Sequence, residues 1–119
     1  MTLLSPLAVV QAQLDAYNAK DLDALMATYA PDAQQFALHG SLLAEGHEQI
    51  RPRYEMRFAE PDLHARLLSR TVLGNFVTDL EIVTRNLPEG KGTVEMLCVY
   101  EVVEGRIVRA SFATGETRI

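Results

Sequence analysis

The stretch from residue 17 to residue 33 constrains the fold more than any other part of the sequence. It reads YNAKDLDALMATYAPDA, and so contains a helix end, a break, a short second helix and the start of a strand. Asp21 can cap the second helix, whose apolar stripe runs to Tyr29 before Pro31 ends it. A short strand is predicted over residues 33–38, although its alternation of apolar and polar side chains is imperfect.

Longer helices are predicted on either side of this stretch. Ser5 followed by a proline has the form of an N-cap with proline at the first helical position, and predicts a helix over Pro6–Ala19. Apolar residues at helical spacing predict another helix within residues 46–58. Because Pro52 lacks the N–H of a helical hydrogen bond, its regular part is expected to begin only around residues 48–50.

The second half of the chain changes to the pattern of long strands. Residues 94–103 are apolar on both alternating sets of positions, which predicts a central strand that is covered on both faces. The helices cover one face, and a second subunit is expected on the other. The four predicted strands form an antiparallel meander with short turns, over His64–Leu73, Asn75–Asn86, Thr93–Val103 and Arg106–Thr114.

Length and composition predict one α+β domain over residues 1–119, with helices on one side of a curved sheet. The chain has 119 residues, 48% of them hydrophobic, which suits a single core. Its net charge of −5, without a basic cluster, argues against nucleic acid as a partner. No apolar run approaches the roughly 20 residues that span a bilayer, and Cys98 has no disulfide partner. A cytoplasmic protein without membrane contact is therefore expected.

Three motifs resemble the NTF2-like superfamily, which includes SnoaL-like polyketide cyclases, ketosteroid isomerases and scytalone dehydratase. The segments NAKDLD at 18–23 and YAPDA at 29–33 are similar to the superfamily's opening N-A-G-D-x-D … F-A-D-D-A. GHEQIR at 46–51 resembles the start of its third helix, and EGRIV at 104–108 its last hairpin. The resemblance covers nearly the whole chain. It implies a cystatin-like cone, with three N-terminal helices packed on a strongly curved antiparallel sheet.

The resemblance does not imply ketosteroid isomerase activity, because this sequence has other residues at all three catalytic positions. It places Gln13 at the position of the oxyanion-binding tyrosine, Ala37 at that of the Asp base and Cys98 at that of the protonated Asp. Ala37 cannot take a proton, and a thiol is a weak donor. Tyr54 matches a tyrosine that supports the oxyanion site from the third helix.

Asp79 and Glu81 are the strongest candidates for acid–base chemistry. Because they lie two apart on a predicted strand, their carboxylates point to one face, about 6–7 Å from each other. The residue pattern favours Phe76, Leu80 and Ile82 as the core face, which leaves both acids in solvent. The resemblance instead turns the acids toward a cavity, and both alternatives stay open. In a buried pair, repulsion and desolvation would raise one pKa.

Other candidate residues carry weaker signals. His39 follows the short strand near the expected pocket mouth, where it is either a proton carrier or an exposed loop residue. The histidines show no H-x-H or H-E-x-x-H spacing, so no metal site is expected. The residues expected to line the pocket or to orient a ligand are Gln13, Tyr17, Tyr54, Met96, Cys98, Ala110 and Phe112.

Two functions remain open on the sequence. The first is binding of a small, mostly apolar molecule in a conical cavity, with cofactor-free chemistry of the isomerase, cyclase or lyase type. Asp79 or Glu81 would then act as acid or base. The alternative is a non-catalytic homodimeric module, joined through the outer sheet face, that binds a ligand or protein without changing it. No motif identifies the substrate or the pathway.

Overall fold

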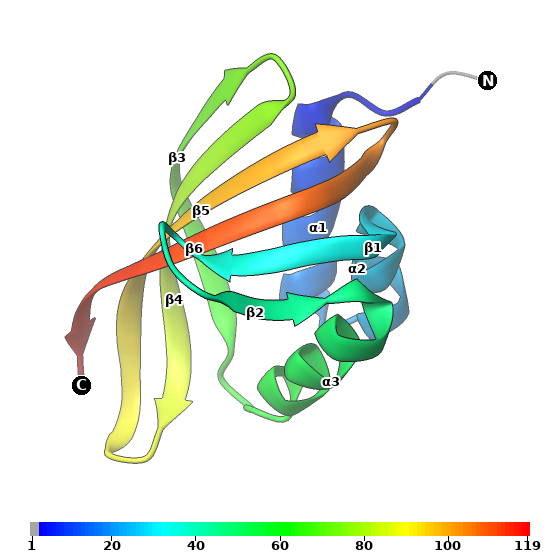
Figure 1. The fold of residues 1–119 in the computed structure, drawn as a ribbon. Coiled ribbons are helices and arrows are strands. Elements are labelled where there is room, and N and C mark those ends of the chain that lie inside the picture. The colour runs from blue at the N-terminus through cyan, green and yellow to red at the C-terminus, as the bar shows by residue number, and fades with distance from the viewer. Residues whose placement is uncertain (1–2) are drawn as a thin grey trace.

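Three helices and one six-stranded sheet make up the computed structural model, which describes residues 3–119 (Figure 1). The helices are α1 (Pro6–Ala19), α2 (Leu22–Thr28) and α3 (Gly46–Phe58). The strands are β1 (Tyr29–Ala37), β2 (Leu42–Glu45), β3 (His64–Leu73), β4 (Phe76–Leu87), β5 (Gly90–Val103) and β6 (Arg106–Arg118).

The sheet has the order β2-β1-β6-β5-β4-β3, and it curves around the side on which the helices lie (Figure 1). Strands β3 to β6 pair antiparallel with their sequence neighbours, which confirms the predicted meander. The pairing of β1 with β6 is parallel, so the sheet is mixed. The predicted α+β fold class is confirmed. The sheet differs from the predicted antiparallel sheet in the parallel pairing of β1 with β6.

The predicted caps set the bounds of the first two helices. Ser5 accepts a hydrogen bond from the Ala8 N–H at 3.2 Å, and α1 begins at the next residue, a proline. The helix ends where Lys20 adopts a left-handed conformation, with φ at 55°. Asp21 then caps α2 by accepting from the Ala24 N–H at 3.1 Å.

The boundary between α2 and β1 differs from the prediction. α2 ends at Thr28, and Tyr29 begins the strand instead of completing the helical stripe. The reason is tertiary, because Tyr29 pairs with Ile107 of β6 and is fully buried. Pro31 therefore lies within the strand. It is exposed there, in a stretch where the pairing with β6 is interrupted, so its missing N–H breaks no ladder bond.

The start of α3 also differs from the prediction. The helix begins at Gly46 rather than around residues 48–50, and Pro52 lies inside it. The carbonyl that Pro52 leaves without a helical partner belongs to Glu48, an exposed residue that water can reach. At the other side of this turn, Ile50 is fully buried and anchors the helix to the core.

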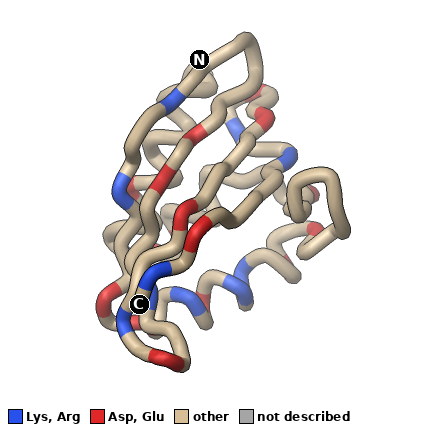
Figure 2. Tube along the Cα trace, turned by 90° about the vertical axis from the view of Figure 1, so that its left-hand side faces the viewer, with Lys and Arg blue, Asp and Glu red and all other residues tan. Residues whose placement is uncertain are grey.

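Charged residues of both signs are interspersed along the chain (Figure 2). Exposed ion pairs such as Arg51–Asp23, at 2.7 Å, contribute little to stability. Within residues 3–119, no helix is long and apolar enough to cross a membrane.

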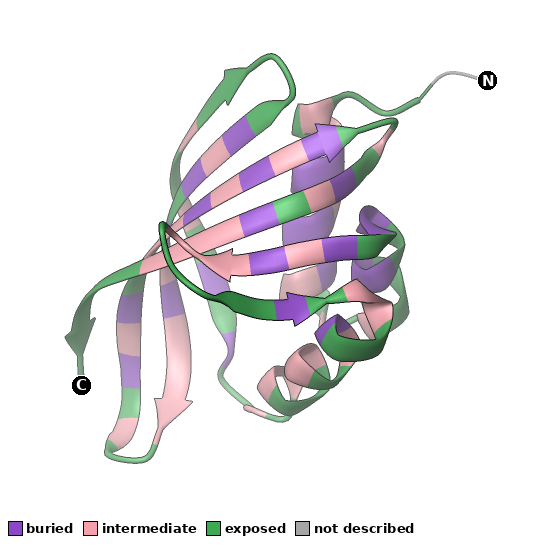
Figure 3. Ribbon diagram, viewed as in Figure 1, coloured by how far each residue is buried: buried purple, intermediate pink, exposed green. Residues whose placement is uncertain are grey.

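The core lies between the helices and the inner face of the sheet, where buried residues alternate along the strands (Figure 3). On β5, Cys98 and Tyr100 point inward and are almost completely buried, whereas Leu97 and Val99 point outward and are half-buried. The inner face of this strand is covered as predicted. In the described part of the chain, no helix lies over its outer face (Figure 1).

Candidate functional site

A cavity of about 630 Å³ opens on the inner side of the sheet, between β-strands and the helices α1 and α3. This is within the range of about 300–1,000 Å³ that small-molecule pockets have. Its apolar walls come from Leu14, Ala37, Leu43, Met56, Ala65, Val83, Val94, Met96 and Phe112. Its polar lining comes from Gln13, Tyr17, Arg53, Tyr54, Arg57, Glu60, Glu81, Arg85, Cys98, Tyr100 and Thr114.

The cavity brings together seven of the residues that the sequence singled out, and leaves three outside. Asp79 is completely buried and does not line the cavity. Ala110 is packed in the hydrophobic core, and His39 lies in an exposed turn. The seven that line the cavity are Gln13, Tyr17, Tyr54, Glu81, Met96, Cys98 and Phe112.

The two acids of β4 both point to the inner face. Asp79 is 0% exposed and Glu81 is 5% exposed, whereas Phe76 and Leu80 are 48% and 38% exposed. The prediction of a core face from the apolar pattern is therefore wrong, and the orientation implied by the resemblance is correct. On the inner face of β4, Val77 and Asp79 are fully buried, whereas Glu81 and Val83 line the cavity.

Asp79 is bound by an arginine of the neighbouring strand. Arg70 on β3 lies opposite Asp79 and donates two hydrogen bonds to its carboxylate, at 2.7 and 2.9 Å. A third Arg70 N–H donates to Gln11 of α1 at 2.8 Å. This bidentate pair keeps a charged carboxylate inside the protein. Arg70 thus compensates the buried charge of Asp79 and joins α1 to the sheet through Gln11.

Among residues 3–119, Glu81 has no such counter-ion, and its pKa is shifted. Burial, and next the negative charge of Asp79, raise the pKa of Glu81 from 4.5 to about 7. The Cys98 thiol lies 3.7 Å from its carboxylate and donates a weak hydrogen bond. A carboxyl group with this pKa is present in both protonation states at neutral pH, as acid–base catalysis requires.

Cys98 is a poor nucleophile in these surroundings. Burial and the nearby Glu81 raise the pKa of the thiol well above its usual value, so the thiol stays protonated. On the same strand, Tyr100 donates to the Gln13 side chain at 3.4 Å. Two of the replaced isomerase positions, Gln13 and Cys98, thus line one wall of the cavity without supplying a strong acid.

A hydrogen-bonded chain on the opposite wall orients Tyr54. Arg53 of α3 donates to the Gln35 carbonyl at 2.6 Å, and an arginine can only donate. The Gln35 amide nitrogen therefore donates to the hydroxyls of Tyr54, at 3.0 Å, and of Tyr29, at 3.2 Å. Tyr54 keeps its own proton, because burial raises its pKa. Tyr54 lines the cavity, and its hydroxyl is a candidate donor to a ligand oxygen.

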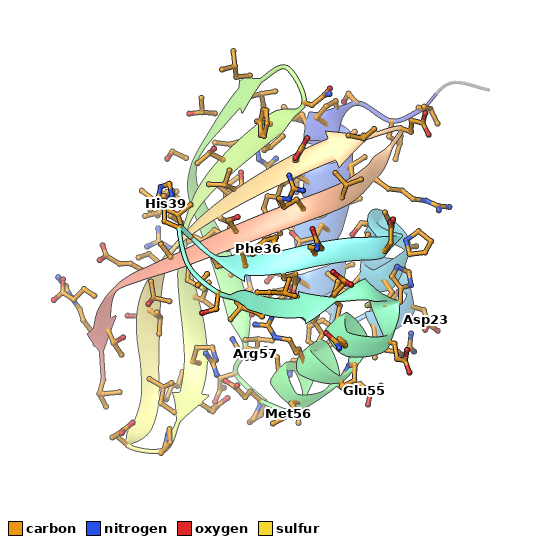
Figure 4. All side chains as sticks on the ribbon, viewed as in Figure 1. Asp23, Phe36, His39, Glu55, Met56 and Arg57 are labelled. Atoms are coloured by element: carbon orange, nitrogen blue, oxygen red, sulfur yellow. The ribbon has the colours of Figure 1, made fainter. Side chains whose placement is uncertain are left out.

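A charged cluster forms part of the cavity lining. Arg85 donates to both carboxylate oxygens of Glu60 at 2.8–3.1 Å, and Arg57 lies 3.6 Å from the same carboxylate. Burial opposes the ionisation of Glu60, but Arg85, the Asn86 N–H and Arg57 outweigh it and lower its pKa. Arg57 lies on the side of α3 that faces the strands, with Glu55 on the opposite side (Figure 4).

Sequence reasoning missed the arginines of α3, although a signal was present. Ile50, Tyr54 and Phe58 are the apolar residues at helical spacing that predict this helix. Arg53 and Arg57 follow Ile50 by three and seven residues, which places them on the same face. Charged residues within an otherwise apolar stripe indicate a cavity or a partner.

His39 does not reach the cavity. The chain continues past β1, where the Leu38 N–H donates to the Phe112 carbonyl at 2.8 Å, and then turns. His39 has a φ of 56° in this turn and points into solvent (Figure 4). His39 is therefore an exposed loop residue and not a candidate proton carrier. Among residues 3–119, no three His, Cys, Asp or Glu side chains are grouped as a metal ion would require.

Residues 10–110 match the model of the SnoaL-like domain. An uncharacterised cystatin-fold protein from Novosphingobium aromaticivorans is 28% identical, with a TM-score of 0.85 over 92% of this chain and 98% of that one. A proposed polyketide cyclase from Sinorhizobium meliloti is 24% identical, with a TM-score of 0.73 over 92% and 100%. IdmH from Streptomyces antibioticus, also a proposed polyketide cyclase, is 21% identical, with a TM-score of 0.79 over 93% and 92%. A comparison with curated proteins gave no match.

Proposed function

Since this chain belongs to the SnoaL-like domain family, we propose that it is a cofactor-independent enzyme acting on a small, mostly apolar carbonyl compound. The reaction is an isomerisation, a cyclisation or a dehydration. The observation that carries the proposal is Glu81, a buried carboxyl in the cavity wall whose pKa is raised to about 7. Two proteins of similar structure, described as proposed polyketide cyclases, support the same reaction class.

In the proposed mechanism, Glu81 moves a proton at a carbon next to the substrate carbonyl. The ionised carboxylate removes that proton, and the electron pair of the C–H bond forms an enolate. Tyr54 donates a hydrogen bond to the enolate oxygen. Glu81 then returns the proton to another carbon, which completes an isomerisation, or to an oxygen after the enolate carbon has attacked a second carbonyl, which completes a cyclisation.

Asp79 has a supporting role in this mechanism. Its ion pair with Arg70 removes it from the cavity surface, and its charge helps to keep the pKa of Glu81 near neutrality. The apolar walls, including Met96 and Phe112, hold the substrate and exclude water. Gln13 and Tyr17 supply further polar contacts from α1.

Turnover by a Glu81→Gln variant tests the proposal. Small apolar ketones and diketones are screened with wild-type protein, without added cofactor, and the active compounds are then assayed with the variant. We expect at least about a 100-fold loss of kcat, because the amide cannot take a proton. Glu89→Gln, in an exposed turn, is the matched control and keeps full turnover. Full turnover in Glu81→Gln would reject the role of Glu81.

A non-catalytic ligand-binding module is the alternative. It is favoured by the replacement of the isomerase positions by Gln13, Ala37 and Cys98, none of which is a strong acid or base. The same screen separates the two functions. A compound that binds in the cavity but is unchanged between pH 5 and pH 9 would support the module, as would the absence of turnover for every compound that binds.

We also propose that the protein forms a homodimer through the outer sheet face. Leu80 and Leu97 are opposite each other on β4 and β5, and Phe76 is 48% exposed nearby on the same face. An apolar sheet face of this kind is suited to a second copy. Leu80→Lys is expected to convert dimers into monomers at micromolar concentration in light scattering. Leu7→Lys, at an exposed apolar position of α1, should leave the dimer intact, and a monomeric wild type would contradict the proposal.

A further inference from the structure

The charge of the cavity lining is opposite in sign to that of the whole chain. The chain has a net charge of −5, yet three arginines and only two glutamates line the cavity. One of the glutamates is Glu81, which is half protonated near pH 7. The other is Glu60, which already binds Arg85 through both oxygens and lies 3.6 Å from Arg57. Glu60 is therefore not available to Arg53.

Arg53 has no acidic partner among residues 3–119. Its one hydrogen bond goes to the amide oxygen of Gln35, a residue that is 0% exposed. The hydroxyls of Tyr29 and Tyr54 fix the orientation of this amide, so the amide holds the guanidinium in place by one N–H. The remaining N–H groups of Arg53 are left for a further acceptor, and Arg53 lines the cavity.

The spacing of Arg53 and Arg57 favours an anion beside Arg53, because, of the two, only Arg57 lies next to Glu60. The two arginines lie four residues apart on α3, and like charges at this spacing repel each other. Both are on the helix face that is turned toward the sheet, where apolar residues would pack better. A bound anion would turn this repulsion into attraction. A planar carboxylate fits best, because it can accept two parallel N–H groups from one guanidinium.

From this arrangement we infer that the substrate is an acid, whose carboxylate is bound by Arg53 and attracted by Arg57 while its apolar body occupies the cavity. The inference rests on the proposed function for the site, and it narrows the substrate class from carbonyl compounds to carbonyl-containing acids.

Paired binding of an acid and its amide tests the inference. Naphthaleneacetic acid and naphthaleneacetamide have nearly the same size and shape and differ in charge. Isothermal titration calorimetry at pH 6, below the Glu81 pKa, measures both. We expect the acid to bind wild-type protein at least about tenfold more tightly than the amide, which is the scale of a charge-assisted hydrogen bond. Arg53→Gln should remove this preference and leave amide binding within about twofold.

Arg51→Gln is the matched control, because Arg51 lies on the same helix, bound to Asp23 outside the cavity. It should keep the preference for the acid. Equal binding of acid and amide by wild-type protein, or no binding of the acid, would overturn the inference. So would an equal loss of both affinities in Arg53→Gln. Preference for the acid without turnover of any compound would leave the anion site in place and reject only the enzyme.

Discussion

Replacing Arg70 by methionine is expected to lower the free energy of unfolding by about 3–5 kcal/mol, which is the cost of removing one partner of a buried ion pair. Asp79 is 0% exposed, and both of its carboxylate oxygens accept hydrogen bonds from Arg70 alone. Methionine keeps most of the aliphatic volume but supplies no donor. The carboxylate is then left without a partner beside Glu81.

Urea unfolding, followed by circular dichroism, measures this change. The control is Arg118→Met, which removes an exposed pair with Glu116 and should leave the urea midpoint almost unchanged. A second variant, Arg70→Met with Asp79→Leu, removes both charges and should recover much of the lost stability. Similar small losses in Arg70→Met and Arg118→Met would show that the buried pair does not matter to the fold.

The second large effect concerns Glu81→Gln, which is expected to stabilise the protein by about 3 kcal/mol above pH 7 and to have little effect below pH 4.5. The folded-state pKa of about 7 lies above the ordinary value of 4.5, so the folded state holds this proton more tightly than the unfolded state. Between these two values, stability falls as pH rises, and the loss is complete above pH 7. A rise from 4.5 to about 7 corresponds to about 3 kcal/mol.

Unfolding curves of wild type and Glu81→Gln at several pH values between 4 and 9 measure this difference. Groups that do not interact with Glu81 titrate equally in both proteins, so their contributions cancel in the comparison. The amide oxygen can still accept the weak hydrogen bond of Cys98. A constant difference across the whole pH range would contradict a shifted carboxyl. A gain in stability together with a loss of turnover is the pattern expected of a residue retained for function.

The parts of the fold that the sequence predicts well are those set by local chemistry. Ser5 and Asp21 cap helices through their own side chains, and the starts of α1 and α2 follow from them. Tyr29 was misassigned to a helix, because its position depends on pairing with Ile107, which is 78 residues away in the sequence. β2 was not predicted, since its four residues have no strong pattern of their own.

The site was harder to predict than the fold, for a physical reason. Burial patterns assume that inner faces are apolar, and this fails on β4, where Glu81 faces a cavity and Leu80 faces outward. Only the resemblance to the NTF2-like superfamily predicted correctly which side chains of β4 face inward. Arg53 escaped notice because its partner, the buried Gln35, lies on a different element. Contacts of this kind depend on how the helix sits over the sheet, which no local spacing encodes.

The position of β6 determines when the protein can fold during synthesis. This strand is the last in the sequence, yet it lies inside the sheet, between β1 and β5. A nascent chain that still lacks it has two unpaired strand edges, and one of them belongs to the long apolar β5. Completion of the sheet must therefore wait until β6 has left the ribosome, and until then the edges are open to aggregation. C-terminal truncations that remove β6 would split the sheet into two parts.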